Sequence, residues 1–260
     1  MTPDQRRILR DHLLEALIAG PTRTPRSNVV ANAEKLAEGD PDKHLGVGAR
    51  GRSAADVMQA VADLCGCSPS LEERDGPGDI DPDRTLDAMH ALGDRIEKAV
   101  RGEQRMLIAT GHPTGLLAMY QAWARALQPV GVTLQTPLDD ATLDPPKTYR
   151  RPRRFRYLDD VAVLCTGADV LHTHESWPME ALLAALDEPP DLVLADHGFA
   201  GAAIMAGVET VCFTDVNDPA IAVAKADGLV DVVVPLDDNV PPARYGPLRD
   251  YVLGRIDAAT

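Results

Sequence analysis

The stretch RMLIATGHPTGLL, residues 105–117, joins a short apolar run to a turn and then to a helical pattern. The run from Arg105 to Ala109 is typical of a buried strand, and Pro113 suits the first position of a helix. Later apolar runs end in a similar way, at residues that can bind a metal, a proton or a phosphate. Those ends are His172-Thr173-His174-Glu175, Asp196-His197-Gly198, Asp215-Val216-Asn217-Asp218 and Asp237-Asp238-Asn239. Strands that alternate with helices predict an α/β fold with a Rossmann-like, mainly parallel sheet.

The repeated position of these polar residues indicates a binding site. In a parallel sheet the carboxyl ends of the strands lie along one edge, and ligands bind there. We therefore expect four of the seven histidines, and many carboxylates, to meet in one crevice.

The chain is expected to divide near residue 103. Residues 1–103 have helical patterns and no convincing strand, which predicts a helical cap or an N-terminal helical layer. Ser53 with Asp56 resembles a capping box, and Asp81-Pro82 suits a helix start. An apolar stripe is predicted on a first helix, and its members are Ile8, Leu9, Leu13, Leu14 and Leu17. Residues 104–260 are predicted to form the α/β domain that carries the site.

Composition excludes several classes of function. The 260 residues include 40 acidic and 26 basic ones, a formal charge of -14, which disfavours binding to nucleic acid or an anionic membrane. No apolar run is long enough to span a membrane, so we expect a soluble cytoplasmic protein. The four cysteines lack the spacing of a structural zinc site, and no disulfide framework is expected. The oligomeric state stays open, with a homo-oligomer as one alternative.

Arginines gather at one place in this acidic chain. The segment from Lys147 to Arg156 contains five of them and runs into a predicted hairpin, residues 154–157 with 161–164. Several guanidinium groups there can draw in and hold an anionic metabolite. A solvated loop or a subunit contact is the alternative.

The turn after the first strand is a candidate phosphate site. At a helix start, free N–H groups and nearby hydroxyls can hold a phosphate. The residues assigned to this role are Thr110, Gly111, Thr114 and Gly115. The turn has neither the Gly-Lys-Ser/Thr of a Walker A loop nor a G-x-G-x-x-G fingerprint, and an ordinary tight turn is the alternative.

The other strand ends are candidates for metal binding and proton transfer. On a strand, His172 and His174 would project to the same face with Cα atoms about 7 Å apart. The predicted metal ligands are His172, His174, Asp196, Asp215 and Asp218, and the predicted acid–base residues are His112, His174, Asp196 and His197. Mg²⁺ or Mn²⁺ suits such a set. Helix capping is the alternative for the carboxylates.

Several of these segments also resemble a known family. The stretches ATGHPTGLL (109–117), LHTHE (171–175), ADHGFAGAA (195–203), TDVNDPA (214–220) and VPLDDNV (234–240) are similar to a family of bacterial proteins labelled phosphatase. The similarity runs from about residue 79 through most of the chain. Residues 210–235 also distantly resemble sugar isomerase (SIS) domains, which bind phosphosugars on a Rossmann-like sheet, although the serine- and threonine-rich phosphate loop of those domains is missing.

These observations predict a phosphatase that hydrolyses a small phosphorylated metabolite with the help of a metal, at the carboxyl edge of the sheet. The haloacid-dehalogenase D-x-D-x-T/V motif and the R-H-G of histidine phosphatases are both missing, so neither mechanism can be transferred. The alternative is a SIS-like phosphosugar isomerase, or a phosphosugar-binding protein without hydrolase activity. Neither the substrate nor the individual proton-transfer roles follow from the sequence.

Overall fold

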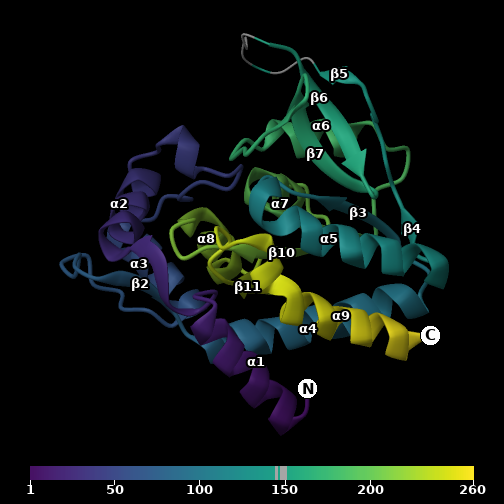
Figure 1. The fold of residues 1–260 in the computed structure, drawn as a ribbon. Coiled ribbons are helices and arrows are strands. Elements are labelled where there is room, and N and C mark those ends of the chain that lie inside the picture. The colour runs from purple at the N-terminus through teal and green to yellow at the C-terminus, as the bar shows by residue number, and fades with distance from the viewer. Residues whose placement is uncertain (144–145, 147–150) are drawn as a thin grey trace.

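The computed structural model describes residues 1–143, 146 and 151–260 (Figure 1). Its main sheet has the strand order β11-β10-β9-β3-β7-β6-β5, with β4 beside β3 and β8 beside β7. The five parallel neighbours at its centre are β11 (Val232–Pro235), β10 (Thr210–Thr214), β9 (Leu192–Asp196), β3 (Arg105–Ala109) and β7 (Val161–Thr166). This mixed, mostly parallel sheet confirms the predicted α/β class.

The remaining strands of the sheet are short or antiparallel. They are β4 (Thr133–Leu134), which is parallel to β3, and β5 (Thr142–Leu143), β6 (Arg153–Leu158) and β8 (Asp169–Val170), which pair antiparallel. The hairpin of β6 and β7 was predicted from sequence. Asp159 and Asp160 connect its strands with φ angles of 51° and 59°, the left-handed conformation that tight hairpin turns require.

Helices flank the sheet in two groups (Figure 1). In one group α4 (Pro82–Arg101), α5 (Pro113–Leu127) and α9 (Gly246–Ala259) pack together, with α1 (Pro3–Glu15) against α4. In the other, α6 (Trp177–Ala184), α7 (His197–Met205) and α8 (Pro219–Ala226) form a row that α3 (Ala54–Cys65) and α2 (Arg26–Ala37) extend. Short 3-10 helices lie at Pro41–Lys43, Gln128–Val130 and Pro242–Tyr245.

The N-terminal region departs from its prediction, because it contains strands. β1 (Gly20–Pro25) pairs antiparallel with β2 (Pro77–Ile80). The prolines of these segments argue against a central strand. In a sheet of two strands both are edges, where a missing N–H is tolerated.

The predicted helix starts in this region are confirmed. Ser53 and Asp56 form a capping box, and Asp81 caps α4 with Pro82 at its first position. The first apolar stripe is only partly buried. Leu9 and Leu13 lie in the core, but Ile8 is 59% exposed, and Leu17 lies beyond the end of α1 with a φ of 59°.

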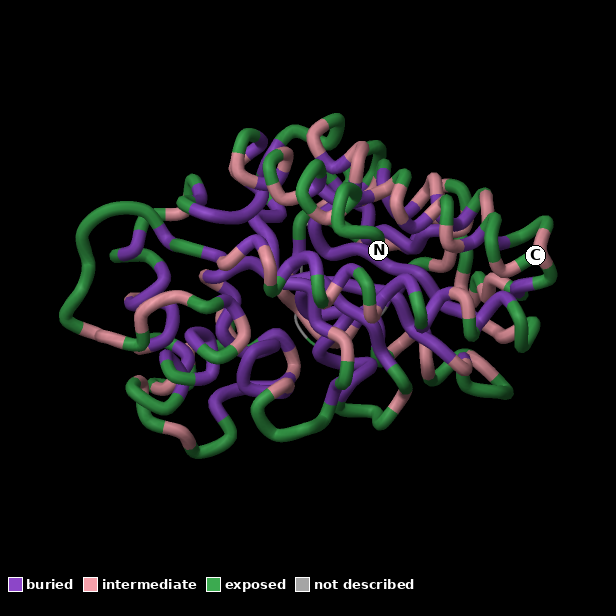
Figure 2. Tube along the Cα trace, turned by 90° about the horizontal axis from the view of Figure 1, so that it is seen from below, coloured by how far each residue is buried: buried purple, intermediate pink, exposed green. Residues whose placement is uncertain are grey.

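Residues from both sides of position 103 share one hydrophobic core. Leu13, Val30, Val57 and Met89 belong to the same cluster of buried side chains as the central strands. Figure 2 shows the buried segments running through the middle of the molecule, with exposed residues on the outer turns and loops. The division near residue 103 stays a prediction. None of the helices in the described ranges has both the length and the apolar character needed to cross a membrane.

Candidate functional site

The carboxyl ends of four parallel strands, β3, β9, β10 and β11, and the segment after β8 surround a cavity of about 230 Å³. The residues of these segments that line it are His112, His172, His174, His197, Asp215, Asn217, Asp218, Asp238 and Asn239. The N-terminal region completes the wall with Thr24, Asn28, Asn32 and Lys43. The predicted convergence of the four histidines is therefore confirmed as geometry, while their roles remain predictions.

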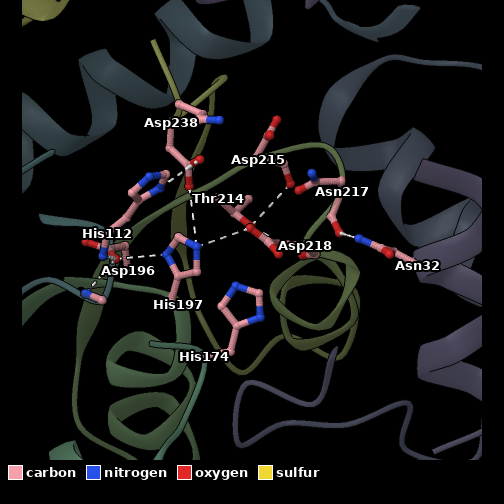
Figure 3. Close-up of polar contacts among 12 residues, drawn as sticks. Asn32, His112, His174, Asp196, His197, Thr214, Asp215, Asn217, Asp218 and Asp238 are labelled. Atoms are coloured by element: carbon pink, nitrogen blue, oxygen red, sulfur yellow. Dashed lines mark hydrogen bonds and ion pairs between the residues drawn. The ribbon is translucent and has the colours of Figure 1, made fainter. Parts of the chain in front are cut away.

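Two of the histidines are oriented through Nδ1. His174 Nδ1 lies 2.8 Å from the backbone carbonyl oxygen of Asp42, an acceptor, so Nδ1 carries the proton. His197 Nδ1 lies 2.9 Å from Oδ1 of Asp196 (Figure 3). In both rings this arrangement leaves Nε2 for a partner in the cavity.

The carboxylate of Asp196 is fully buried and joins two strand ends. Its Oδ1 accepts hydrogen bonds from the N–H groups of Gly111 and His112, at 2.8 and 3.0 Å, in addition to its contact with His197. One carboxylate oxygen thus fixes the turn after β3 and the first residue of α7. His197 itself has a φ of 50°, an uncommon conformation for a residue with a side chain and one that needs such support.

Asp238 lies between two histidines (Figure 3). Its Oδ1 is 3.1 Å from His112 Nδ1, and its Oδ2 is 3.7 Å from His197 Nε2. The Nε2 of His197 is also 3.5 Å from Oδ2 of Asp218. The sequence placed Asp238 in one of the strand-end clusters but not among the predicted metal ligands or acid–base residues, so its central place in the site was missed.

Among the described residues, two groups of side chains are close enough to hold a metal ion. They are His172 with His174 and His197, and His112 with His197 and Asp238. The ligand atoms of each group lie within 4.8 Å of one another. His172 and His174 lie in an irregular segment rather than on a strand, and their ring centroids are 5.0 Å apart.

The histidines differ in their protonation. Burial lowers the pKa of His197, but the surrounding carboxylates, Asp218 foremost, outweigh it and raise the pKa to about 10. Burial and three neighbouring histidines lower the pKa of His172 to about 4. At neutral pH His172 is therefore a neutral ring, the form that binds metals.

The carboxylates also differ in the direction in which their pKa values are shifted. Burial, followed by the nearby acids Asp238 and Asp237, raises the pKa of Asp215 well above its usual range. Burial also raises the pKa of Asp218. The pKa of Asp238 is lowered although the group is buried, because His112 and His197 favour its charged form. Opposed shifts among neighbouring titratable groups are typical of functional sites.

The turn from Thr110 to Gly115 already has protein partners. The N–H groups of Gly111 and His112 donate to Asp196, and the N–H of Gly115 donates to the carbonyl of His112 at 3.1 Å. A Cβ at Gly115 would lie 2.1 Å from the carbonyl oxygen of Asp238, and one at Gly111 would lie 2.6 Å from that of Thr173. These glycines let neighbouring strand ends approach closely, and the phosphate role of Thr110, Gly111, Thr114 and Gly115 stays a prediction.

The N-terminal region supplies residues that the sequence did not indicate. Asn32 Nδ2 donates to the carbonyl of Asn217 at 2.7 Å, and Thr24 Oγ1 donates to Oδ2 of Asp215 at 3.2 Å. Lys43 lines the cavity and lies 3.0 Å from Asp42. No spacing or composition connects these residues to strand ends so much later in the chain.

A larger cavity of about 760 Å³ adjoins the first, and His172 and His174 line both. Of the arginine-rich segment, Arg153 lines the larger cavity. Arg154 and Arg156 pair with Asp140, and Arg151 lies 3.8 Å from Asp169. Arg150 lies outside the described residues. Among the arginines that the structure describes in this segment, only Arg153 is placed to hold an anion in this cavity.

Comparison with known proteins agrees with the resemblance seen in the sequence. A sequence model of a family described as phosphatase matches residues 4–260. The chain belongs to this phosphatase family. A curated protein of Streptomyces coelicolor named as a phosphatase is 40% identical over 252 residues, with 94% of each chain covered. Membership in the phosphatase family supports a phosphate-removing hydrolase that takes a phosphorylated substrate.

Proposed function

We propose that this phosphatase hydrolyses small phosphate monoesters in the 230 Å³ cavity with the help of a divalent metal, Mg²⁺ or Mn²⁺. His172, His174 and His197 are the proposed nitrogen ligands, and Asp218 and Asp238 the proposed oxygen ligands. Asp215, which lines the same cavity, is a further oxygen candidate.

The orientation of His174 and His197 carries this proposal. Each ring has Nδ1 beside a carbonyl or carboxylate oxygen, which leaves Nε2 for the cavity. Histidines that bind metals almost always have their second nitrogen held in this way. Asp196 was predicted as a metal ligand from sequence. We now assign it to positioning, because its Oδ1 is already shared by three donors.

Charge supports the need for a cation. The cavity is lined by the carboxylates of Asp215, Asp218 and Asp238 and by one lysine, Lys43. When His197 is neutral and all three carboxylates are ionised, as metal binding requires, a phosphate dianion entering the cavity would meet net negative charge. A bound dication would offset this charge, neutralise phosphate oxygens and activate water.

Phosphate binding and proton transfer would be carried out by side chains of the protein. Lys43 would bind a phosphate oxygen from the N-terminal side through a charge-assisted hydrogen bond. His112, whose Nδ1 lies 3.1 Å from Asp238, would carry a proton to the departing alkoxide. His197 would give up its proton when the metal binds, because only a neutral ring can be a ligand.

The test is phosphate release by the purified protein from a panel of phosphate monoesters. The panel is run after chelation and again after addition of Mg²⁺ or Mn²⁺. We expect hydrolysis that disappears with chelator and returns with one of these metals. His174→Gln should lose metal binding and activity, whereas His90→Gln, which changes a histidine outside the cavity, should keep both.

Two results would count against the proposal. If the folded protein binds phosphosugars but releases no phosphate with any metal, the binding role predicted as the alternative is correct. If phosphate is released at the same rate after complete removal of metal, the hydrolysis stands but its metal dependence does not.

A further inference from the structure

We propose that the 760 Å³ cavity receives the alcohol part of the substrate and selects a sugar-sized group that is neutral or positively charged over one with a second anion. This inference rests on the proposed function and adds a substrate class to it.

The two cavities meet at residues that belong to both. His172 and His174 line each of them, and the adjacent residues Asp42 and Lys43 line the larger and the smaller cavity respectively. An ester whose phosphate lies beside Lys43 would therefore extend past the two histidines into the larger space.

The volume of the larger cavity sets the size of the group. At about 760 Å³ it is roughly three times as large as the 230 Å³ cavity, and its volume lies within the usual range of small-molecule sites. A methyl or ethyl group would fill little of this space. A hexose can occupy it and contact the walls formed by Leu171 and Trp177.

Charge sets the preference. The larger cavity is lined by three carboxylates, those of Asp42, Glu175 and Glu180, and among its described residues by one arginine, Arg153. Asp42 is partly neutralised by Lys43 at 3.0 Å, and Glu175 accepts a hydrogen bond from the indole of Trp177 at 2.8 Å. A second carboxylate or phosphate on the alcohol part would face this acidic wall, whereas an ammonium group would be attracted to it and to the indole.

The test uses three six-carbon 6-phosphates of nearly equal size and different charge. They are glucose 6-phosphate, which is neutral apart from its phosphate, glucosamine 6-phosphate, which adds an ammonium group, and 6-phosphogluconate, which adds a carboxylate. We expect kcat/KM for the first two to exceed that for 6-phosphogluconate by about tenfold or more, since one close like-charge contact is of this order. p-Nitrophenyl phosphate serves as the general substrate.

A charge reversal in the lining of the larger cavity tests whether its carboxylates cause the preference against a second anion. Glu180 is exposed on α6 and lies outside the proposed metal set, so Glu180→Lys should reduce the preference against 6-phosphogluconate at least threefold. Glu180→Gln should reduce it less. Glu72→Lys makes the same change of net charge at an exposed position that lines neither cavity, and it should leave the ratio unchanged.

The outcomes separate this inference from the proposed function. Equal kcat/KM for the three sugars, or hydrolysis of p-nitrophenyl phosphate but of no sugar phosphate, overturns the substrate class and leaves the hydrolase intact. If Glu72→Lys changes the ratio as much as Glu180→Lys, long-range charge rather than the cavity sets the preference, and the inference fails. If the protein hydrolyses none of the esters, both the proposed function and this inference are wrong.

Discussion

The ring of His174 is held by the backbone carbonyl of Asp42, a residue 132 positions earlier in the chain, at a distance of 2.8 Å. Asp42 lies in the short 3-10 helix Pro41–Lys43, which also places Lys43 in the cavity. The N-terminal region therefore does more than cover the sheet edge, since it orients a candidate ligand and adds a positive charge. We infer that the α/β part alone would have an incomplete site.

Replacement of Asp196 by Asn should weaken metal binding about 10- to 100-fold, the usual effect of losing a group that orients a ligand. The amide can still accept from the N–H groups of Gly111 and His112, so the fold should persist. It lacks the charge that holds the proton on Nδ1 of His197. Titration of the metal-free protein against a competing indicator measures the affinity.

The matched control is Asp257→Asn, which removes a carboxylate from the exposed surface of α9. It should change neither affinity nor activity. An Asp196→Asn protein that binds metal as tightly as the parent would show that Asp196 has no positioning role.

Lys43→Met should raise KM for phosphate esters by about 10-fold or more, because a hydrogen bond to a charged group contributes roughly 1.5–3 kcal/mol. Lys43 is largely buried, with 14% of its side chain exposed, so water would replace it poorly. Metal affinity should change little. Steady-state kinetics and metal titration on the same preparation separate the two effects, with the exposed Lys98→Met as the control. A loss of metal binding with unchanged KM would contradict the phosphate role.

The sequence predicted the half of the site that depends on strand order alone. Apolar runs that end in polar residues indicate strand ends, and parallel pairing brings those ends to one edge. His112 and His197 lie at this edge for this reason. His172 and His174 reach the same cavity in an irregular segment after the antiparallel strand β8, so the structural basis predicted for this pair was wrong.

The other half of the site depends on tertiary contacts that leave no local pattern. Lys43 and Thr24 are ordinary polar residues in sequence, and only the packing of the N-terminal region on the sheet edge brings them to the cavity. The different roles of Asp238, a proposed ligand, and Asp196, a positioning residue, could not be predicted from the sequence either. Whether a buried carboxylate binds a ligand or anchors the backbone depends on which N–H groups face it, as the bonds of Asp196 to the turn after β3 show.

Gly115→Ala should destabilise the protein and disturb the site. The new Cβ would lie 2.1 Å from the backbone oxygen of Asp238, and backbone cannot rotate away as a flexible side chain can. We expect a loss of about 1–3 kcal/mol, as in other overpacked positions. Activity should fall as well, because Asp238 would shift away from His112 and His197. Chemical denaturation and kinetics measure the two effects.

Gly254→Ala is the matched control, because it adds the same methyl group to a different helix at a position with free space around it. Gly254 lies inside α9 and is exposed, and a Cβ there has no atom within 4 Å. Alanine should stabilise the helix by about 0.5–1 kcal/mol without changing activity. Equal stability of the two variants would show that the contact between Gly115 and Asp238 is not tight.

Asp215→Asn should stabilise the metal-free protein at neutral pH while lowering its activity. Burial and the neighbouring acids raise the pKa of Asp215 in the folded state. An aspartate in the unfolded chain has a pKa of about 3.9. Below this pH, Asp215 is protonated in both the folded and the unfolded state, and it does not make the stability depend on pH. Above it the unfolded state releases the proton more readily than the folded state, so stability decreases as pH rises.

Asparagine removes this penalty and can still accept from the N–H of Val216, which lies 2.6 Å from Oδ1. The gain should therefore be absent near pH 3.5, grow as the pH is raised, and reach on the order of 1 kcal/mol or more at pH 7, about 2–4 °C in Tm. Thermal melts of both proteins in chelator at several pH values measure it. A constant difference across this range would contradict the raised pKa, because a charge-independent change in packing has no pH dependence. A gain that vanishes when Mn²⁺ is added would follow from a metal that compensates the same carboxylates in the parent protein.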